Sequence, residues 1–358
     1  MKPRSLGLPD FPWDRLAPYA QTARAHPDGI VDLSVGTPVD STPDVVRRAL
    51  EAASDSPGYP LTTGSDELRA AIRRWLVRRC GSPDDVGILP TIGSKQLVAL
   101  LPTLLGLGPG DAVLIPRLAY PTYAVGAQLA GCEVVTAPRD DVRLVWMNSP
   151  SNPTGRVSPP EEQAQIVRWA RGVGAVVASD ECYLDLGYDE TPVSALDEAV
   201  RGGSLDGVLA VHSLSKRSSA AGLRLGVVAG DADLVAGLLE ASKHAGLIVP
   251  GPVQAAGVAA FDDEAHVEQI RDRYRARRDR LRPALRAAGF EVDHSSAGLY
   301  LWSTRAEDCW TTVGFLAEQG ILVAPGEFYG PAGAQHVRVA LTATDERIDA
   351  AVTRLALL

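Results

Sequence analysis

The stretch GVLAVHSLSKRSSAAGLR, residues 207–224, joins a strand-like run to a lysine with polar neighbours. Its first part is short, rich in β-branched residues and begins with Gly, which predicts a buried strand. A lysine directly after such a strand, here Lys216, is costly to bury unless it is paired or used covalently. Ser213, Ser215 and Arg224 lie nearby, and a guanidinium with hydroxyl groups suits a phosphate. The stretch indicates a phosphorylated aldehyde held on Lys216 as an imine, with a stray lysine in a surface loop as the alternative.

Similar strand-like runs occur on both sides of this stretch. They are short, apolar and bounded by Gly, Pro or Asp, and they read DAVLIP (111–116), RLVWMN (143–148), GAVVASD (174–180) and LGVVAG (225–230). Helical patterns alternate with strands in this region. The clearest spans 65–80, ends before Gly81 as a plausible C-cap, and places four large apolar residues on one face: Leu68, Ile72, Trp75 and Leu76. The alternation predicts a mostly parallel sheet covered by helices on both faces.

The pattern changes after about residue 250. A long charged helix is expected at 264–288, followed by the runs LYLW, ILVAPG and HVRVAL and a closing helix from Thr344. A chain of 358 residues usually exceeds one compact core, so two domains are expected. We therefore predict an α/β fold. Its large domain is expected at 45–250, and a smaller α+β domain is expected from 1–44 together with 251–358.

Composition and charge exclude several classes of protein. Apolar residues make up 46% and charged residues 22%, and no run approaches the roughly 18 apolar residues of a membrane helix. The N-terminal MKPRSLGLPDFPWDRL carries Pro and Asp where a signal peptide is apolar, so a cytoplasmic protein is expected. A net charge of −9 argues against a nucleic-acid partner. The cysteines lack metal-ligand spacing, so free thiols and no metal site are expected at Cys80, Cys132, Cys182 and Cys309.

Two further motifs could hold a nitrogen heterocycle. Asp180 ends a predicted strand, where its carboxylate could pair with a pyridinium nitrogen, and Tyr183 could donate to a ring oxygen. A helix N-cap is the plain alternative for Asp180. In the run NSPSNPTG, residues 148–155, the Asn152 side chain could reach the same ring oxygen, although Asn-Pro-x-Gly is also ordinary turn chemistry.

The remaining candidates lie before or after the motifs at residues 148–224. Gly93, Ser94 and Lys95 open a predicted helix whose free N–H groups suit a phosphate, although a simple helix start reads the same way. Tyr120 offers a ring for stacking, unless it packs in the core. Arg338 lies in a strand pattern, where it could bind a carboxylate or form a surface salt bridge. Two more candidates are Gly36, whose N–H could approach a carboxylate, and Tyr59, which could reach a phosphate.

The order of these pieces resembles the class I and II aminotransferases of fold type I. G-S-K, Y-P-x-Y, N-P-T-G, S-D-E-C-Y, S-x-S-K with Arg eight residues on, and a late V-R-V follow one another over nearly the whole chain. The resemblance implies pyridoxal phosphate (PLP) as cofactor, small amino and oxo acids as substrates, and an active site at a homodimer interface. Within the family, the wording of LSVGTPVDSTP, VHSLSKRS and RVALTATDER is most like actinobacterial N-succinyldiaminopimelate aminotransferases.

The resemblance also implies a role for each residue. Lys216 would be the imine lysine and proton shuttle, and Asp180 would bind the ring nitrogen. Tyr183 and Asn152 would bind the ring oxygen, and Tyr120 would stack on the ring. The substrate carboxylate would lie on Arg338 and Gly36. The phosphate would be held by Gly93, Ser94, Lys95, Ser213, Ser215, Arg224 and, from the partner subunit, Tyr59.

Other functions stay open at this point. The chain could transfer the amino group of another amino acid such as aspartate, or act as a PLP-dependent carbon–sulfur β-lyase. An effector-sensing module of a transcription regulator would need a DNA-binding domain, and no helix-turn-helix pattern precedes residue 45. A long dianionic substrate such as N-succinyldiaminopimelate needs a second cation beyond Arg338, for which the candidates are Lys243, His244 and Arg117.

Overall fold

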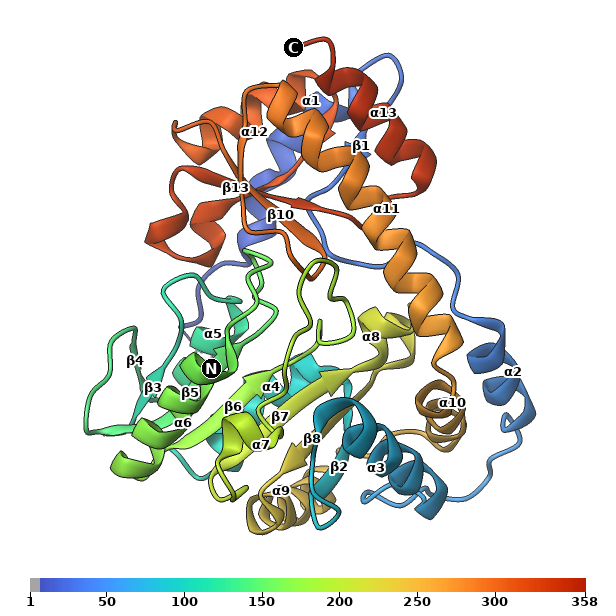
Figure 1. The fold of residues 1–358 in the computed structure, drawn as a ribbon, viewed down its shortest axis with the longest axis vertical. Coiled ribbons are helices and arrows are strands. Elements are labelled where there is room, and N and C mark those ends of the chain that lie inside the picture. The colour runs from blue at the N-terminus through green and yellow to red at the C-terminus, as the bar shows by residue number, and fades with distance from the viewer. Residues whose placement is uncertain (1–6) are drawn as a thin grey trace, which may run out of the picture.

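The computed structural model describes residues 7–358, and the part of the predicted small domain at 1–6 lies outside them. Two main sheets divide the molecule (Figure 1). A seven-stranded sheet fills the lower part of the view, and a four-stranded sheet with its helices forms the upper part. Helix α1 (Ala17–Arg24) lies in the upper part, where it packs against the C-terminal helix α12 (Cys309–Glu318).

The large sheet has the order β2-β8-β7-β6-β5-β3-β4, and its core strands are parallel. Only β8 runs antiparallel to its neighbours β2 and β7. This confirms the predicted mostly parallel sheet. The strands are β2 (Gly87–Ile92), β3 (Ala112–Leu114), β4 (Glu133–Val135), β5 (Val142–Asn148), β6 (Val176–Asp180), β7 (Val208–Ser213) and β8 (Leu225–Gly230).

Helices cover both faces of this sheet, as predicted. Alternate strand residues point to opposite faces: Val177 and Ala210 join one apolar cluster, whereas Ala178 and Leu209 join the other. The first cluster packs under α2 (Asp44–Ala52), α3 (Asp66–Cys80), α6 (Pro160–Val173), α7 (Glu198–Arg201) and α10 (Gly251–Asp262). The second packs under α4 (Gly93–Leu104), α5 (Thr122–Ala130) and α9 (Ala232–Ala245).

Helix α3 follows the prediction in detail. The Ser65 side chain caps its first turn by accepting a hydrogen bond from the Leu68 N–H at 3.2 Å. Gly81 ends it with φ of 62°, a left-handed conformation that favours glycine. The four residues predicted to share a face are all buried.

The second sheet is antiparallel and has the order β12-β13-β10-β9. A separate parallel pair joins Val31 to Ile321 and so ties the N-terminal segment to the C-terminal part of the chain. The strands here are β1 (Val31–Asp32), β9 (Glu291–Asp293), β10 (Tyr300–Thr304), β11 (Ile321–Leu322), β12 (Ala324–Pro325) and β13 (His336–Ala340). The helices are η1 (Pro12–Leu16), α1 (Ala17–Arg24), α11 (Ala265–Ala287), α12 (Cys309–Glu318), η3 (Gly326–Tyr329), η4 (Pro331–Gly333) and α13 (Asp345–Leu355).

Helix α10 begins at the predicted domain boundary between residues 250 and 251. It packs against α2 and α3, on the large sheet, while α11 begins the helices that pack on the small sheet. The division into 45–250 and 1–44 with 251–358 stays a prediction, and we propose to move its second boundary to the start of α11.

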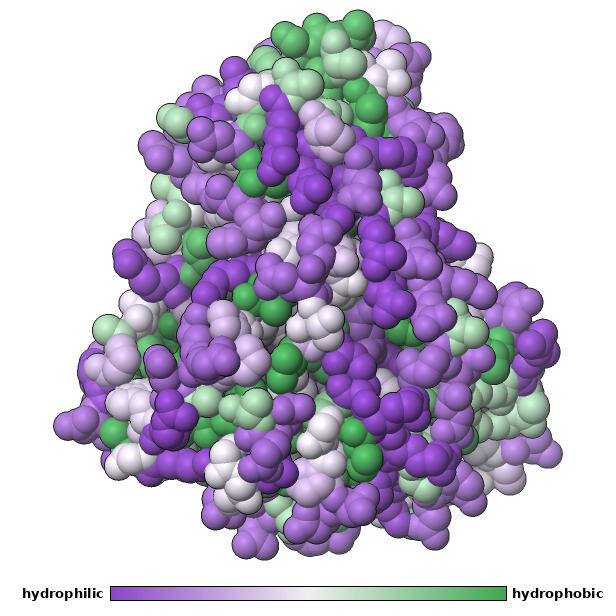
Figure 2. Space-filling view, viewed as in Figure 1, coloured by the Kyte–Doolittle hydropathy of each residue, from purple (hydrophilic) through white to green (hydrophobic). Residues whose placement is uncertain are grey.

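The visible face of the molecule is largely hydrophilic, with apolar residues scattered over it (Figure 2). Among residues 7–358, no helix is both long enough and apolar enough to cross a membrane. Several large apolar side chains are nevertheless exposed, including Val35 at 44%, Val39 at 50% and Leu61 at 62%.

Candidate active site

A cavity of about 950 Å³ is lined by both parts of the molecule, and a volume of this order suits a small ligand. It lies at the carboxyl ends of β6 and β7, under the small sheet. Most of the predicted site residues line it: Gly36, Ser94, Lys95, Tyr120, Asn152, Asp180, Tyr183, Ser213, Ser215, Lys216, Arg224 and Arg338. Gly93 adjoins it through Arg224.

Lys216 lies in the short helix α8 (Leu214–Arg217), which begins where β7 ends. The Ser213 side chain caps this helix and accepts a hydrogen bond from the Ser215 N–H at 3.1 Å. The Lys216 Nζ donates to the carbonyl oxygen of Gly36, which comes from the N-terminal segment. Burial lowers the pKa of Lys216, which favours the neutral amine, the form that can attack a carbonyl group.

Asp180 ends β6 and is buried. Its Oδ2 accepts a hydrogen bond from the Tyr123 hydroxyl at 2.8 Å, and its Oδ1 accepts one from the Cys182 N–H at 3.2 Å. Burial raises the pKa of Asp180, while these two hydrogen bonds act in the opposite direction. No role was predicted for Tyr123 from the sequence, although it is the second tyrosine of the Y-P-T-Y motif, which could have marked it as a site residue.

A group of hydroxyls and one guanidinium forms a cradle beside Lys216. The Ser213 and Ser215 hydroxyls lie 2.9 Å apart. Arg224 adopts φ of 54°, rare for a side chain other than Gly, and follows η2 (Ala221–Leu223). Gly93 at the start of α4 has φ of 66°, and a Cβ there would lie 2.3 Å from the Arg224 guanidinium. Glycine is therefore required for Arg224 to lie against the N-terminus of α4, where free N–H groups suit an anion.

Arg338 lies in β13 and is 3% exposed, so the alternative of a surface salt bridge is wrong. Its Nη1 donates to the Asn152 Oδ1 at 3.0 Å, and its Nη2 donates to the Ser34 carbonyl at 2.8 Å. Its Nε has no hydrogen-bond partner among the described residues. The guanidinium carbon lies 3.9 Å from the centre of the Tyr300 ring. A buried cation without an ion pair in the described chain is suited to an incoming anion.

Three tyrosines complete this part of the cavity. The Tyr183 and Tyr300 hydroxyls lie 3.1 Å apart, and burial raises the pKa of Tyr183. A Cβ at Gly36 would lie 2.0 Å from the Tyr300 hydroxyl, so only glycine permits this approach. Burial raises the pKa of Tyr120 to about 12, which keeps its hydroxyl protonated. Tyr300 lies in the predicted run LYLW, but the alternation of that strand gave no reason to assign it to a site.

Besides Gly93, which only adjoins the cavity, four predicted or candidate residues do not line it. Tyr59 is 99% exposed, and its expected role concerned a partner subunit. Lys243 pairs with Glu240 at 2.6 Å near the end of α9, which fits an ordinary helix-end lysine. His244 and Arg117 are also exposed and outside the cavity lining.

The cavity has two chemically different sides. The polar side consists of Asp180, Ser213, Ser215, Lys216 and Arg224. The aromatic side comes from the N-terminal segment and the small sheet, and consists of Phe11, Trp13, Tyr300, Phe328 and Tyr329. Sequence reasoning missed the aromatic side because no motif marks it.

The donors on the polar side fit pyridoxal phosphate. The cradle of Ser213, Ser215 and Arg224 offers hydroxyl and guanidinium donors for a phosphate. Asp180 offers a buried acceptor for a ring N–H, and Lys216 offers an amine for an aldehyde. Gly93 lies close against the Arg224 guanidinium of this cradle.

Comparison with known proteins gives a consistent result over the length of the chain. The family model for aminotransferase class I and II matches residues 28–355. The 4-dedimethylamino-4-oxo-anhydrotetracycline transaminase OxyQ of Streptomyces rimosus is 58% identical, over 97% of this chain and 99% of that protein. The "Probable aminotransferase Rv1178" of Mycobacterium tuberculosis is also 58% identical, over 98% of this chain and 86% of that protein.

Solved structures share the fold. A probable N-succinyldiaminopimelate aminotransferase from Thermus thermophilus aligns with a TM-score of 0.87 at 27% identity, over 97% of this chain and all of that one. The sequence motifs predicted an N-succinyldiaminopimelate aminotransferase. The solved structure with that name is less identical to this chain than the two relatives above, which carry other names.

Proposed function

The chain belongs to the class I and II aminotransferases, which depend on pyridoxal phosphate, and from this premise we propose that it exchanges an amino group between N-succinyldiaminopimelate and 2-oxoglutarate in lysine biosynthesis. The observation that carries the proposal concerns Arg338. Its side chain is buried and lines the same cavity as Lys216 and Asp180, and its Nε has no hydrogen-bond partner among the described residues. A cytoplasmic location is part of the proposal, supported by four free cysteines.

When bound, the cofactor supplies an electron sink for the negative charge left on the substrate Cα after loss of its proton. We propose that Ser94, Ser213, Ser215 and Arg224 hold the phosphate and that Tyr183 and Asn152 hold the ring oxygen. Asp180 would keep a proton on the ring nitrogen. The hydrogen bonds that Asp180 accepts from Tyr123 and Cys182 support this role, because they stabilise its carboxylate form.

Lys216 would take the proton from the substrate Cα and return it at a different carbon. Burial lowers the pKa of its amine, which supports this role because it shifts the amine toward the neutral form that can accept a proton. Its contact with the Gly36 carbonyl directs the amine toward the N-terminal segment that closes the cavity.

Arg338 would hold the α-carboxylate at the reacting carbon. Two of its nitrogen atoms are fixed by Asn152 and Ser34, so the guanidinium is oriented before substrate arrives. A buried, oriented cation favours substrates with a carboxylate at this position.

A second cation is needed for a long dicarboxylate, and we propose Lys95 for this role. It is the cavity-lining cation, among the described residues, that the polar side and Arg338 leave unused. Its Nζ lies 5.6 Å from the centre of the Phe11 ring, at the edge of the aromatic side. Lys243, His244 and Arg117 are less suitable because none of them lines the cavity.

The aromatic side favours a second candidate substrate. Phe11, Trp13 and Phe328 form a continuous ring cluster, with centroid distances of 5.5 Å and 5.2 Å about Trp13. Such a surface suits a flat apolar substrate. The relative OxyQ is named for an anhydrotetracycline ketone, and a fused-ring ketone is accordingly the alternative for this chain.

A panel of substrates separates these functions. With 2-oxoglutarate as acceptor, N-succinyldiaminopimelate should have the highest kcat/KM among it, diaminopimelate, aspartate and alanine. A higher value for aspartate would overturn the substrate assignment, and amination of the 4-oxo-anhydrotetracycline ketone would replace it by the second candidate. Release of pyruvate from cystathionine without an oxo-acid acceptor would instead indicate the carbon–sulfur lyase.

We also propose a homodimer in which Tyr59 contributes to the phosphate site of the partner. The almost complete exposure of Tyr59 supports this, because nothing in the described part of its own chain covers it. Leu61, Val35 and Val39 are apolar and exposed as well, and contact with a second copy would remove them from water.

A further inference from the structure

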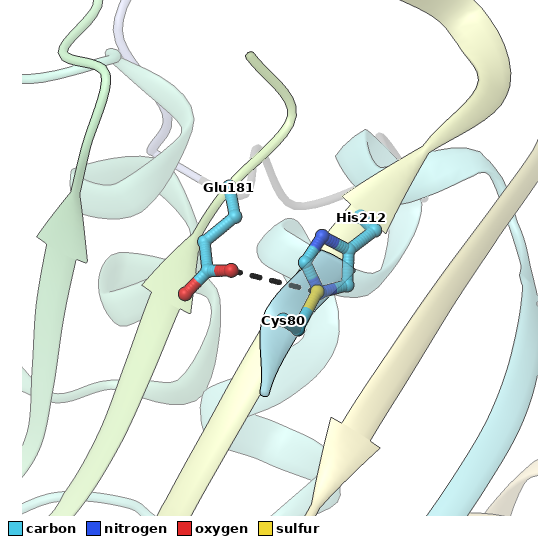
Figure 3. Close-up of side chains that lie close together, drawn as sticks. All are labelled: Cys80, Glu181 and His212. Carbon is cyan, nitrogen blue, oxygen red and sulfur yellow. Dashed lines mark ion pairs between the residues drawn. The ribbon is translucent and has the colours of Figure 1, made fainter. Parts of the chain in front are cut away.

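A second group of reactive side chains lies behind the polar side of the cavity. Cys80 ends α3, Glu181 directly follows Asp180 at the end of β6, and His212 lies in β7 one residue before Ser213. One ligand atom from each of Cys80, Glu181 and His212 lies within 4.8 Å of the other two. Figure 3 shows the Cys80 sulfur beside the His212 ring and the Glu181 carboxylate directed toward that ring, and all three residues are buried.

The polar atoms of this cluster are poorly satisfied. Neither ring nitrogen of His212 has a hydrogen-bond partner in the described part of the chain, nor does the Glu181 Oε2. The His212 Nε2 lies 3.6 Å from that Oε2, which is too long for a hydrogen bond. The other carboxylate oxygen, Oε1, accepts from the Ala195 N–H at 2.7 Å. Buried acceptors without donors are rare and call for an explanation.

The surroundings disfavour separate charges on the three groups. All three side chains are buried, with exposed fractions of 1% for Cys80 and 2% for both Glu181 and His212, so an isolated charge on any of them would lack solvation. The charged neighbours Arg79, Asp185 and Arg217 are already engaged, because both arginines donate to the Asp185 carboxylate. A divalent cation with one thiolate, one carboxylate and one neutral imidazole forms a unit without net charge, which suits a buried site.

We propose that Cys80, Glu181 and His212 bind one Zn²⁺ ion. A set of one sulfur, one nitrogen and one carboxylate oxygen is typical of zinc, whereas Mg²⁺ and Ca²⁺ prefer oxygen ligands alone. The His212 ring is held edge-on against Trp75, at 4.8 Å between ring centroids and 87° between planes, so its lone pairs have a fixed direction. A water molecule would take the fourth position. The ion would tie α3 to β6 and β7, directly behind Asp180 and Ser213.

Metal content of tag-free holoenzyme tests this proposal. After dialysis against metal-free buffer, elemental analysis should find about one zinc per chain. The Cys80→Ser and His212→Gln variants should retain almost none, while Cys132→Ser, which removes a buried cysteine outside the cluster, should match the wild type. Absence of bound zinc from wild-type protein that also fails to take it up on titration, or full zinc retention by Cys80→Ser, would overturn the proposal.

Replacement of zinc by cobalt in the wild-type protein provides a readout that does not depend on the folding of the Cys80 and His212 variants. Wild-type protein loaded with Co²⁺ should show ligand-field bands at longer wavelengths than the cofactor absorbs, together with a band from a thiolate ligand. Both should persist in Cys132→Ser. Cobalt bound without a thiolate band would contradict the assignment of Cys80. These spectra do not depend on transamination, so the proposal stands or falls separately from the proposed function.

Discussion

On one side of the cavity, Asp180, Ser213 and Lys216 follow directly from the ends of two buried strands; on the other, Phe11 and Tyr329 come from segments far apart in the sequence. The proposed role of the polar side needs a few residue types at fixed positions after a strand, because each would have to meet one atom of a rigid cofactor. The aromatic side needs only apolar surface, which many residues can supply. Cofactor chemistry can therefore be recognised in a sequence more readily than substrate choice.

The largest effect is expected on the polar side, at its amine. Lys216→Ala should lower transamination by about 10⁴-fold, because the proposed role of this residue is both to attach the cofactor and to move the proton. The variant should still bind the cofactor non-covalently through the cradle. Borohydride reduction of the wild type and peptide mapping check the assignment, and a label on Lys95 or Lys243 would contradict it.

Asp180→Asn should lower kcat by about 100-fold or more, because a neutral amide no longer stabilises a proton on the ring nitrogen. Cofactor content should fall much less, since the phosphate cradle is unchanged. Asp180→Glu keeps the charge and should be milder. A loss of only a few-fold in Asp180→Asn, measured by steady-state kinetics, would remove this residue from the chemistry.

At the border between the two sides, Lys95→Met should lower kcat/KM for dicarboxylate substrates by about 10- to 100-fold. Alanine, which has one carboxylate, should be almost unaffected. Lys243→Met is the matched control, because that lysine is paired with Glu240 outside the cavity. This variant should leave kcat/KM unchanged for both kinds of substrate. Equal losses on both substrates would exclude Lys95 from specificity.

The smallest effect is expected from Tyr59, which does not line the cavity of its own chain. Tyr59→Phe should weaken cofactor binding by about 2- to 10-fold, which corresponds to one hydrogen bond to the phosphate of the partner. Equilibrium dialysis measures this affinity, and light scattering measures the oligomer. An active monomer with unchanged affinity after the substitution would show that Tyr59 serves no partner.

The sequence predicted those parts of the fold whose signals are local. Helix α3 was recognisable because its cap, its apolar face and its Gly81 stop agree. Strand β2 was missed because Pro90 argues against a central strand, and β2 is in fact an edge strand, where proline is tolerated. Helix α10 gave no sign of which sheet it covers, since its apolar residues fit either.

The same distinction holds for the site. Lys216 and Arg338 were recognisable from a lysine after a strand and an arginine within one. Tyr300 was not, because its role depends on the missing side chain of Gly36, far away in the sequence. The cysteine spacing predicted no metal site, whereas the fold brings Cys80 to residues on two other elements. Residues that meet only through tertiary packing have no characteristic spacing in the sequence, so the sequence alone does not predict their contact.

The pairing of Val31 with Ile321 has a consequence for the synthesis of the chain. The strands of the large sheet are complete once residue 230 has been translated, so Lys216 and Asp180 can already be in place on a nascent chain. Strand β1 must wait for β11, and Arg338 follows later still. The cofactor site can thus form before the ribosome has produced Arg338, the residue proposed to hold the substrate carboxylate.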